Sequence, residues 1–339
     1  MGPATVDFAN FAAGDDATRL SISQQFVTSL KDHGAARLIN CDVSEAATTE
    51  YLQLAAPFFA LPLHIKQRIA ITPRPEPQRG YGAEGSEPLS NLDRRAQDGN
   101  SSKRSEVIDV REHFDAGPPG DKRFPSAFPD ETELPHFEQA MASYWTIFQQ
   151  ASFQLLEAIE LGLNLPKDAL LSLCKEPCSE LRFNHYPKVP LDVLAAGRKQ
   201  RAAPHSDIGI ISLLFQDDVG GLEIEDRQNS TAEHRCFMPV PAVGSRDIVL
   251  LVGDTLERWT NGVMKAAIHR VSPSNDGATV SNGKEPKGYC PERYSGAFFV
   301  KPDFEASVAP LAQFGRSDSI KDITYLAYHQ GRLGKIYTE

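Results

Sequence analysis

The spacing of apolar residues differs between the two halves of the chain. Up to about residue 178, apolar residues recur every three or four positions, the spacing of helices that pack on a core. This spacing predicts helices over 15–32, over 44–62 with Ser44 as N-cap, over 137–162, and over a shorter segment that begins at 166. A short strand is expected at 36–39.

From Glu180 onward, short runs rich in Val, Ile, Leu and Phe alternate with clusters of Gly, Pro, Asp and Asn. The predicted strands lie within 181–187, 208–215, 221–226, 236–241, 247–254, 267–273 and 294–302, and a last helix is expected at 319–330. This pattern is typical of a β-sandwich or jelly roll. The polar segments 84–105 and 273–289 predict loops. We expect the first to close over a bound ligand and the second to lie on the surface.

Composition excludes several classes of protein. The chain has 339 residues, enough for one large domain or two small ones, and a net charge of -10, which argues against a nucleic-acid partner. No run reaches the roughly 18 to 20 apolar residues of a membrane-spanning helix, and the N-terminus does not resemble a secretory signal. The five cysteines are scattered and predict reduced thiols. We therefore expect a cytoplasmic protein without a membrane partner.

Three histidines are followed two positions later by an acidic residue, and one of these pairs stands out. His205-Ser206-Asp207 enters a predicted strand, where side chains two positions apart point to the same face. Farther along, His269 lies in another short apolar strand. Two imidazoles and one carboxylate form the facial triad of non-haem Fe(II) oxygenases. The alternative for His269 taken alone is a histidine packed in the core.

Two further strands repeat this spacing with other polar residues. Arg293 and Ser295 point the same way, and an arginine beside a hydroxyl can bind a carboxylate. Asn184 and Tyr186 likewise share one face of their strand. Polar side chains on the inner face of a sheet are costly unless they bind something, so these pairs predict one polar interior.

The stretches that carry these residues resemble a known family. "LRFNHYP", "PHSDIGIISLLFQDDVGGLEI", "VGDTLERWTNGVMKAAIHRV" and "ERYSGAFF" are similar to core strands of the isopenicillin N synthase-like Fe(II)/2-oxoglutarate-dependent dioxygenases. The ordered set of His-x-Asp, His and Arg-x-Ser is more specific than any single stretch. The resemblance implies an α+β fold, in which a double-stranded β-helix (jelly roll) is surrounded by helices mainly from the N-terminal third. It also implies one structural unit with three parts: a mainly helical region 1–178, a catalytic core 179–305, and a C-terminal helix and tail 306–339.

The resemblance also implies roles for single residues. His205, Asp207 and His269 match the iron ligands, and Arg293 and Ser295 match the residues that hold the far carboxylate of 2-oxoglutarate. Tyr186 and Asn184 match residues that contact the co-substrate at its other end. With Fe(II), 2-oxoglutarate and O₂, such an enzyme oxidises a small organic molecule of specialised metabolism and releases succinate and CO₂. The outcome is hydroxylation, desaturation or ring rearrangement, and we expect a monomer or weak homodimer.

Two other functions stay open at this point. An iron-dependent oxidase of the same fold would use the arginine and serine for its substrate's own carboxylate, without 2-oxoglutarate. A non-catalytic binding protein on this scaffold would have no reason to keep all five of these residues. The phenylalanines of the strands (Phe183, Phe215, Phe298 and Phe304) suggest an apolar or aromatic substrate, and Asp254 is expected only to form a turn.

Overall fold

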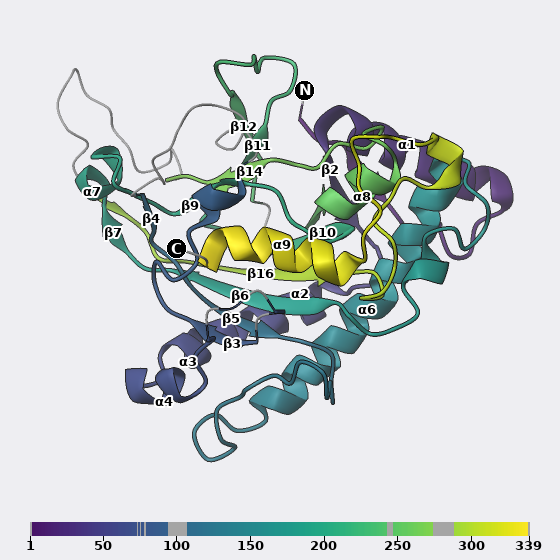
Figure 1. The fold of residues 1–339 in the computed structure, drawn as a ribbon. Coiled ribbons are helices and arrows are strands. Elements are labelled where there is room, and N and C mark those ends of the chain that lie inside the picture. The colour runs from purple at the N-terminus through teal and green to yellow at the C-terminus, as the bar shows by residue number, and fades with distance from the viewer. Residues whose placement is uncertain are drawn as a thin grey trace.

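The computed structural model describes residues 2–72, 74, 76–77, 79–93, 107–242, 247–273 and 288–337 (Figure 1). Its centre is a large mixed sheet of eight strands in the order β1-β2-β13-β10-β16-β6-β5-β3. A second sheet has four strands in the order β12-β11-β14-β9. Within the described residues, no helix is long and apolar enough to cross a membrane.

Each of the seven strands predicted after Glu180 forms. The eight-stranded sheet consists of β1 (Thr5–Asp7), β2 (Ala35–Ile39), β3 (Gly80–Gly82), β5 (Glu112–Ala116), β6 (Glu180–Tyr186), β10 (Ile211–Gln216), β13 (Ile248–Val252) and β16 (Arg293–Val300). The four-stranded sheet consists of β9 (Ala202–His205), β11 (Leu222–Glu225), β12 (Phe237–Pro239) and β14 (His269–Val271). Two short ladders join β4 (Ile108–Asp109) to β8 (Lys199–Gln200) and β7 (Val189–Pro190) to β15 (Tyr289–Cys290). The remaining strands were not predicted: β1, β3, β4, β5, β7, β8, β9 and β15.

The helices agree with the sequence in part. They are α1 (Asp16–His33), α2 (Glu45–Gln53), α3 (Ala55–Phe59), α4 (Leu63–Arg68), α6 (Phe137–Gly162), α7 (Leu191–Ala195), α8 (Asp254–Trp259) and α9 (Tyr325–Tyr337). Short 3₁₀ turns occupy η1 (Leu89–Leu92), η2 (Leu171–Leu173) and η4 (Ala312–Phe314). The helices α1 and α6 confirm two predictions, whereas the predicted helix from residue 166 is wrong, because only the turn η2 forms there.

The single helix predicted over 44–62 is also wrong at one point. The chain forms α2 and α3 in its place, with a break at Leu54. Pro57 has no N–H to donate to the carbonyl of Gln53, and its ring crowds that carbonyl, so a continuous helix is disfavoured. The predicted cap is confirmed, since Ser44 Oγ accepts a hydrogen bond of 3.0 Å from the amide of Ala47. The last helix begins at Tyr325, six residues later than expected.

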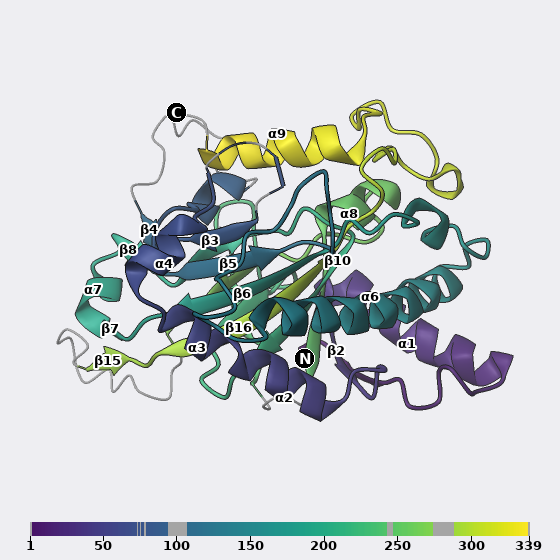
Figure 2. The same ribbon diagram turned by 90° about the horizontal axis from the view of Figure 1, so that it is seen from below.

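One face of the large sheet is covered by α1, α2, α3 and α6, and α9 lies on the opposite side (Figure 2). Aromatic side chains fill the layer between sheet and helices. The ring of Tyr51 on α2 stacks on that of Phe183, with centroids 4.5 Å apart. Phe148 on α6 stacks on Phe215 at the same centroid distance of 4.5 Å. Every second residue of β6, β10 and β16 therefore belongs to the core beneath these helices.

The alternate residues of β6 and β16 face the other way, toward the four-stranded sheet. Their antiparallel register pairs Arg293 with Tyr186 and Ser295 with Asn184, so that four polar side chains share one face. A cavity lies between the two sheets and is lined by residues of both. The fold thus places an apolar core on one side of the β6–β16 ladder and a polar interior on the other.

The two predicted loops lie largely outside the described residues. Residues 94–106 and 274–287 are not described. The described part of the first segment, 84–93, includes η1 and reaches the cavity with Glu87, Leu89 and Leu92. Closure of this segment over a ligand stays a prediction.

Gly296 allows the large sheet to pack tightly against α2, and its replacement tests this packing. A Cβ atom at Gly296 would lie 2.3 Å from Cε1 of the buried Tyr51. We expect Gly296→Ala to lower the free energy of unfolding by about 1–3 kcal/mol, because the core must shift to admit the methyl group. Urea unfolding measures this change.

Gly331 on α9 provides the matched control, since a Cβ there meets nothing within 4 Å. Gly331→Ala should raise the free energy of unfolding by up to about 1 kcal/mol through helix propensity. Equal effects of the two substitutions would contradict the packing described here.

Candidate active site

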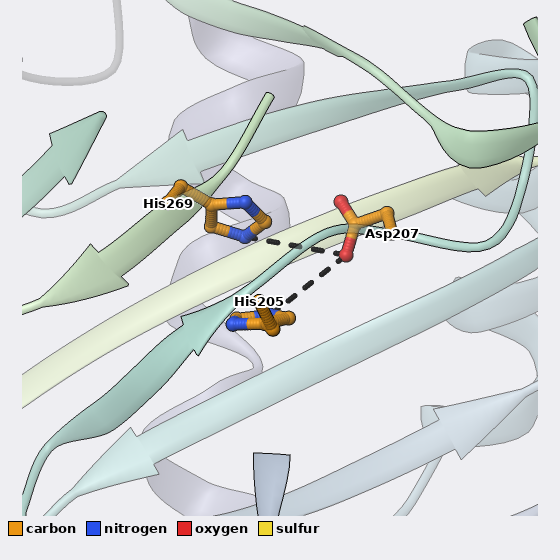
Figure 3. Close-up of side chains that lie close together, drawn as sticks. All are labelled: His205, Asp207 and His269. Carbon is orange, nitrogen blue, oxygen red and sulfur yellow. Dashed lines mark ion pairs between the residues drawn. The ribbon is translucent and has the colours of Figure 1, made fainter. Parts of the chain in front are cut away.

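The three residues of the predicted metal site converge at one end of the four-stranded sheet (Figure 3). His269 on β14 pairs directly with His205 on β9. The Nε2 atoms of these histidines lie 3.9 Å (His205) and 4.0 Å (His269) from Oδ1 of Asp207. The assumption that His205 and Asp207 share a strand is wrong, because β9 ends at His205 and Asp207 lies in the following turn.

Both imidazoles are oriented by the backbone of their own strands. Nδ1 of His205 lies 2.8 Å from the carbonyl oxygen of Ala203, and Nδ1 of His269 lies 3.1 Å from that of Ala267. A carbonyl accepts only, so each Nδ1 carries the proton and each Nε2 offers its lone pair to the centre. Burial, together with the neighbouring His269, lowers the pKa of His205 well below its ordinary value, which keeps that ring neutral.

Asp207 completes the site, and its backbone is held by the first residue of α8. The backbone amide of Asp254 donates a 2.7 Å hydrogen bond to the carbonyl oxygen of Asp207. A side chain at Gly253 is excluded, because its Cβ would lie 2.2 Å from the carbonyl oxygen of Gly209. Oδ2 of Asp207 is buried without a hydrogen-bond partner among the described residues. A buried carboxylate oxygen of this kind is costly unless it binds a cation.

Asp254 does more than form a turn, which sequence reasoning missed. Its fully buried carboxylate accepts a hydrogen bond of 3.0 Å from Tyr328 and pairs with Arg332 at 3.1 Å, both on α9. Arg332 also donates to the carbonyl oxygen of Leu92 at 3.2 Å and to Oγ of Ser206 at 3.3 Å. The C-terminal helix is thereby connected to the turn that carries Asp207.

Arg293 lies across the cavity from the histidines, on the large sheet. Only 2% of it is exposed, and its guanidinium lies 4.9 Å from the ring centroid of Tyr186. Nε donates to the carbonyl oxygen of Gly220 at 2.8 Å, and Nη2 donates to Oε1 of Gln216 at 3.0 Å. Nη1 has no hydrogen-bond partner among the described residues. These contacts fix the direction of a buried cation that still has a donor to offer.

Ser295 and Asn184 lie on the next rung of the same ladder. Nδ2 of Asn184 is 3.5 Å from Oγ of Ser295, and Oδ1 of Asn184 accepts a 2.6 Å hydrogen bond from Arg111. Arg111 also pairs with Glu87, a contact that sequence reasoning did not anticipate. The predicted residues on this wall (Asn184, Tyr186, Arg293 and Ser295) thus line the same cavity as the three candidate ligands.

The rest of the cavity differs from the sequence-based expectation. The cavity has a far end, away from Arg293 along β16, where Glu180, Arg182, Phe299, Lys301 and His329 line it, with Glu87 bonded to Arg182. The apolar side chains of η1 and α9 (Leu89, Leu92, Leu333 and Ile336) also line the cavity and cluster with Tyr186. Three phenylalanines expected near the cavity (Phe183, Phe298 and Phe304) are instead part of apolar clusters outside it. Strand alternation turns Phe183 and Phe298 toward the helices, whereas the fourth phenylalanine, Phe215, does line the cavity. An apolar or aromatic substrate stays a prediction.

Comparison with known proteins decides the family. Residues 177–302 match the 2OG-Fe(II) oxygenase superfamily, and residues 4–136 match the family described as non-haem dioxygenase in morphine synthesis N-terminal. The 2-oxoglutarate-dependent dioxygenase ecdK of Aspergillus rugulosus is 37% identical and is covered over 100% of its length, with 99% of this chain. The chain belongs to the Fe(II)/2-oxoglutarate-dependent dioxygenases.

Other relatives agree with this family. The proline hydroxylase buaE of Petromyces alliaceus is 36% identical, with 98% of this chain and 97% of the relative covered. A full-length protein of Neurospora crassa, crystallised in complex with alpha-KG and thymine, is 26% identical, with a TM-score of 0.82. That comparison covers 99% of this chain and 97% of the other. The family prediction is confirmed, while the narrower likeness to isopenicillin N synthase stays a prediction.

The candidate ligands fit the Fe(II) that this family uses. Two neutral nitrogen donors and one carboxylate, on one side of a point, match the facial arrangement of non-haem iron sites. The unpartnered Oδ2 of Asp207 is an independent sign that a cation belongs there. The dioxygenase therefore has a donor set suited to iron, opposite a buried arginine suited to a carboxylate.

The contact between Asp254 and α9 can be tested by its effect on stability. Asp254→Ala leaves the buried Arg332 without its carboxylate, and we expect the free energy of unfolding to fall by about 3–5 kcal/mol. The matched control is Asp318→Ala at an exposed position, which should change this free energy by less than about 0.5 kcal/mol. Urea unfolding of both variants provides the measurement, and similar midpoints for the two would argue against the contact.

Proposed function

We propose that His205, Asp207 and His269 hold Fe(II) in this dioxygenase, and that Arg293 and Ser295 bind the far carboxylate of 2-oxoglutarate. The chain would oxidise a small organic molecule of specialised metabolism by hydroxylation, desaturation or ring rearrangement. When bound, iron with 2-oxoglutarate and O₂ supplies the oxidising power, and succinate and CO₂ are released. The observation that carries this proposal is the position of the three ligands opposite an arginine with an unused donor, in one cavity.

The residues of this chain prepare the site in two ways. The carbonyl oxygens of Ala203 and Ala267 keep the Nε2 lone pairs of both histidines directed at the metal position. Gly220 and Gln216 hold the Arg293 guanidinium so that it meets a carboxylate without a search for the right rotamer. Arginine suits this place because it stays charged when buried and offers a planar set of donors.

Tyr186 and Asn184 have different supporting evidence. The ring of Tyr186 lies against the Arg293 guanidinium, which supports a role in positioning the co-substrate. Asn184 already accepts from Arg111 and lies near Ser295, so its amide would act by orienting that hydroxyl. We propose that both contact 2-oxoglutarate or its immediate neighbours.

We also infer that the two sheets form the two halves of a double-stranded β-helix, with residues 179–305 as the catalytic core. The helical region 1–178 and the segment 306–339 would complete the same unit, which we expect to act as a monomer or weak homodimer. The pairing of β2 with β13 and of β5 with β6, on the two sides of the core strands in one sheet, supports a single unit.

The family of this chain argues against the alternative, an oxidase that does not use 2-oxoglutarate. In that enzyme Arg293 would bind the carboxylate of the organic substrate. The fungal relative named a 2-oxoglutarate-dependent dioxygenase, similar over the whole chain, favours the co-substrate. Turnover of an organic substrate by the purified protein in the absence of 2-oxoglutarate would establish the oxidase.

Removal of one ligand tests the metal site. In Asp207→Ala, two neutral imidazoles remain and no charge balances the cation. We expect the affinity for Fe(II) or Mn(II) to fall by more than the roughly 10- to 100-fold typical of changes outside the ligand shell. Calorimetry with Mn(II) measures the affinity, and Asp218→Ala at a nearby exposed position is the control. Unchanged affinity in Asp207→Ala would rule out this carboxylate as a ligand.

Substitution of the arginine tests the co-substrate site. Arg293→Ala removes the buried cation, a loss of about 3–5 kcal/mol by analogy with broken buried ion pairs, so 2-oxoglutarate should bind at least about a hundredfold more weakly. Ser295→Ala removes one hydrogen bond to a charged group, about 1.5–3 kcal/mol. Arg293→Lys should restore binding only in part, because an ammonium cannot make the two-pronged contact.

The measurement is the dissociation constant of 2-oxoglutarate with the Mn(II)-loaded protein. Arg316→Ala, at an exposed position, is the control and should bind like the wild type. Tight binding of 2-oxoglutarate by Arg293→Ala would overturn the assignment.

A further inference from the structure

The cavity extends well beyond the space that 2-oxoglutarate needs. Along β16 the residues that face the cavity run from Arg293 through Ser295, Ala297 and Phe299, and Lys301 follows just after the strand. At about 3.3 Å per residue, Arg293 and Phe299 are about 20 Å apart along the strand. A five-carbon dicarboxylate cannot span that length. The far end of the cavity is therefore free for another molecule.

The carboxylates at this far end are already neutralised. Glu87 pairs with Arg111 and, at 2.7 Å, with Arg182. Glu180 pairs with Lys301 and, at 2.7 Å, with Arg79. Each of these two acidic side chains thus bonds to two cations. Neither is well placed to attract the positive group of a ligand.

Two side chains of the same region have unused hydrogen-bonding capacity. Lys301 is 5% exposed, and the only acceptor that the described residues give its ammonium is Glu180, although an ammonium has three donors. His329 on α9 is 4% exposed, and its Nδ1 is buried without a hydrogen-bond partner among the described residues. Burial lowers the pKa of His329 well below its ordinary value, so the ring is a neutral imidazole that can donate one hydrogen bond.

Apolar side chains lie beside these donors. His329, Leu333 and Ile336 are spaced to share one face of α9, and all three line the cavity. Leu89 and Leu92 of η1 extend this apolar surface from Leu333 and Ile336 toward Tyr186, with which they form one cluster. Phe299 provides a flat ring, with the Arg182 guanidinium 5.5 Å from its centroid. The far end therefore combines an apolar surface with a pair of donors.

Resting on the proposed function, we propose that the organic substrate is a small carboxylic acid, whose carboxylate binds Lys301 and His329 and whose apolar body lies against α9 and η1. Arg182 does not take this role, because its donors are used by Glu87 and Asp115. A carboxylate beside Lys301 would satisfy the ammonium and the imidazole together. Lys301 and His329 are then specificity-determining residues of the dioxygenase.

The test compares acids with uncharged molecules of the same shape. The probes are hexanoate, 3-phenylpropionate, L-leucine and L-proline, each beside its primary amide. The Fe(II)-loaded protein is incubated with 2-oxoglutarate and each probe, and succinate release is measured. We expect at least one acid to stimulate release at a concentration about ten- to a hundredfold below that of its amide, the effect of one charge-assisted hydrogen bond.

Variants then assign the preference to the two donors. The preference is expressed as the concentration of amide that stimulates release divided by the concentration of acid that does so. Lys301→Met and His329→Phe should reduce this ratio to about one. Lys301→Arg and His329→Gln, which keep a donor, should retain part of it. The ratio does not depend on how much protein is folded. The double variant Lys301→Met, Glu180→Gln avoids an unpaired buried carboxylate and should behave like Lys301→Met. Lys265→Met, at an exposed position, is the control and should keep the full ratio.

The outcomes separate this inference from the proposed function. Succinate release with equal response to acids and amides, or with no response to any acid, overturns the carboxylate site and leaves the dioxygenase activity intact. A preference for acids that persists in both Lys301→Met and His329→Phe also overturns it. No 2-oxoglutarate-dependent succinate release with or without any probe would instead contradict the proposed function.

Discussion

The antiparallel pairing of β6 with β16 is the constraint on which both the core and the cavity depend. On one face of this ladder, Phe183 and Phe298 pack beneath the helices. On the other face, the Arg293 and Tyr186 rung and the Ser295 and Asn184 rung line the cavity that also contains the candidate metal ligands. A shift of one residue in register would exchange the two faces and place charges in the aromatic core. Packing energy on the apolar side therefore fixes the position of the polar side chains.

The residues of the candidate site were largely predictable, because side chains two positions apart on a strand share a face. The same rule, carried farther along β16 and β6, also covers Phe299, Lys301, Glu180 and Arg182. The sequence-based prediction named only Arg293, Ser295, Asn184 and Tyr186 on these two strands. Glu87, Arg111 and His329 are different, since they enter the cavity from a loop, the link between β4 and β5, and the C-terminal helix. No spacing in the sequence relates those segments to β6, because only tertiary packing brings them together.

The convergence of His205, Asp207 and His269 was predicted, but for a partly wrong reason. His205 and Asp207 were expected to converge as neighbours on one strand, but the strand ends at His205 and a turn places the carboxylate. The convergence comes from the cross-strand pair of His205 with His269 and from the amide of Asp254 that holds the carbonyl of Asp207. Local spacing indicates which side chains share a face, whereas pairing between distant strands decides which of them meet.

The backbone contacts of the two imidazoles have a consequence for how such enzymes diverge. In many metal sites a neighbouring carboxylate or other side chain orients each histidine, so that a substitution there disturbs the metal. Here the carbonyl oxygens of Ala203 and Ala267 do this work, and a substitution cannot remove a carbonyl. Substitutions of side chains at the far end of the cavity would therefore leave both of these imidazole contacts in place. Residues that select a substrate and residues that orient the two histidines are thus separate parts of the chain.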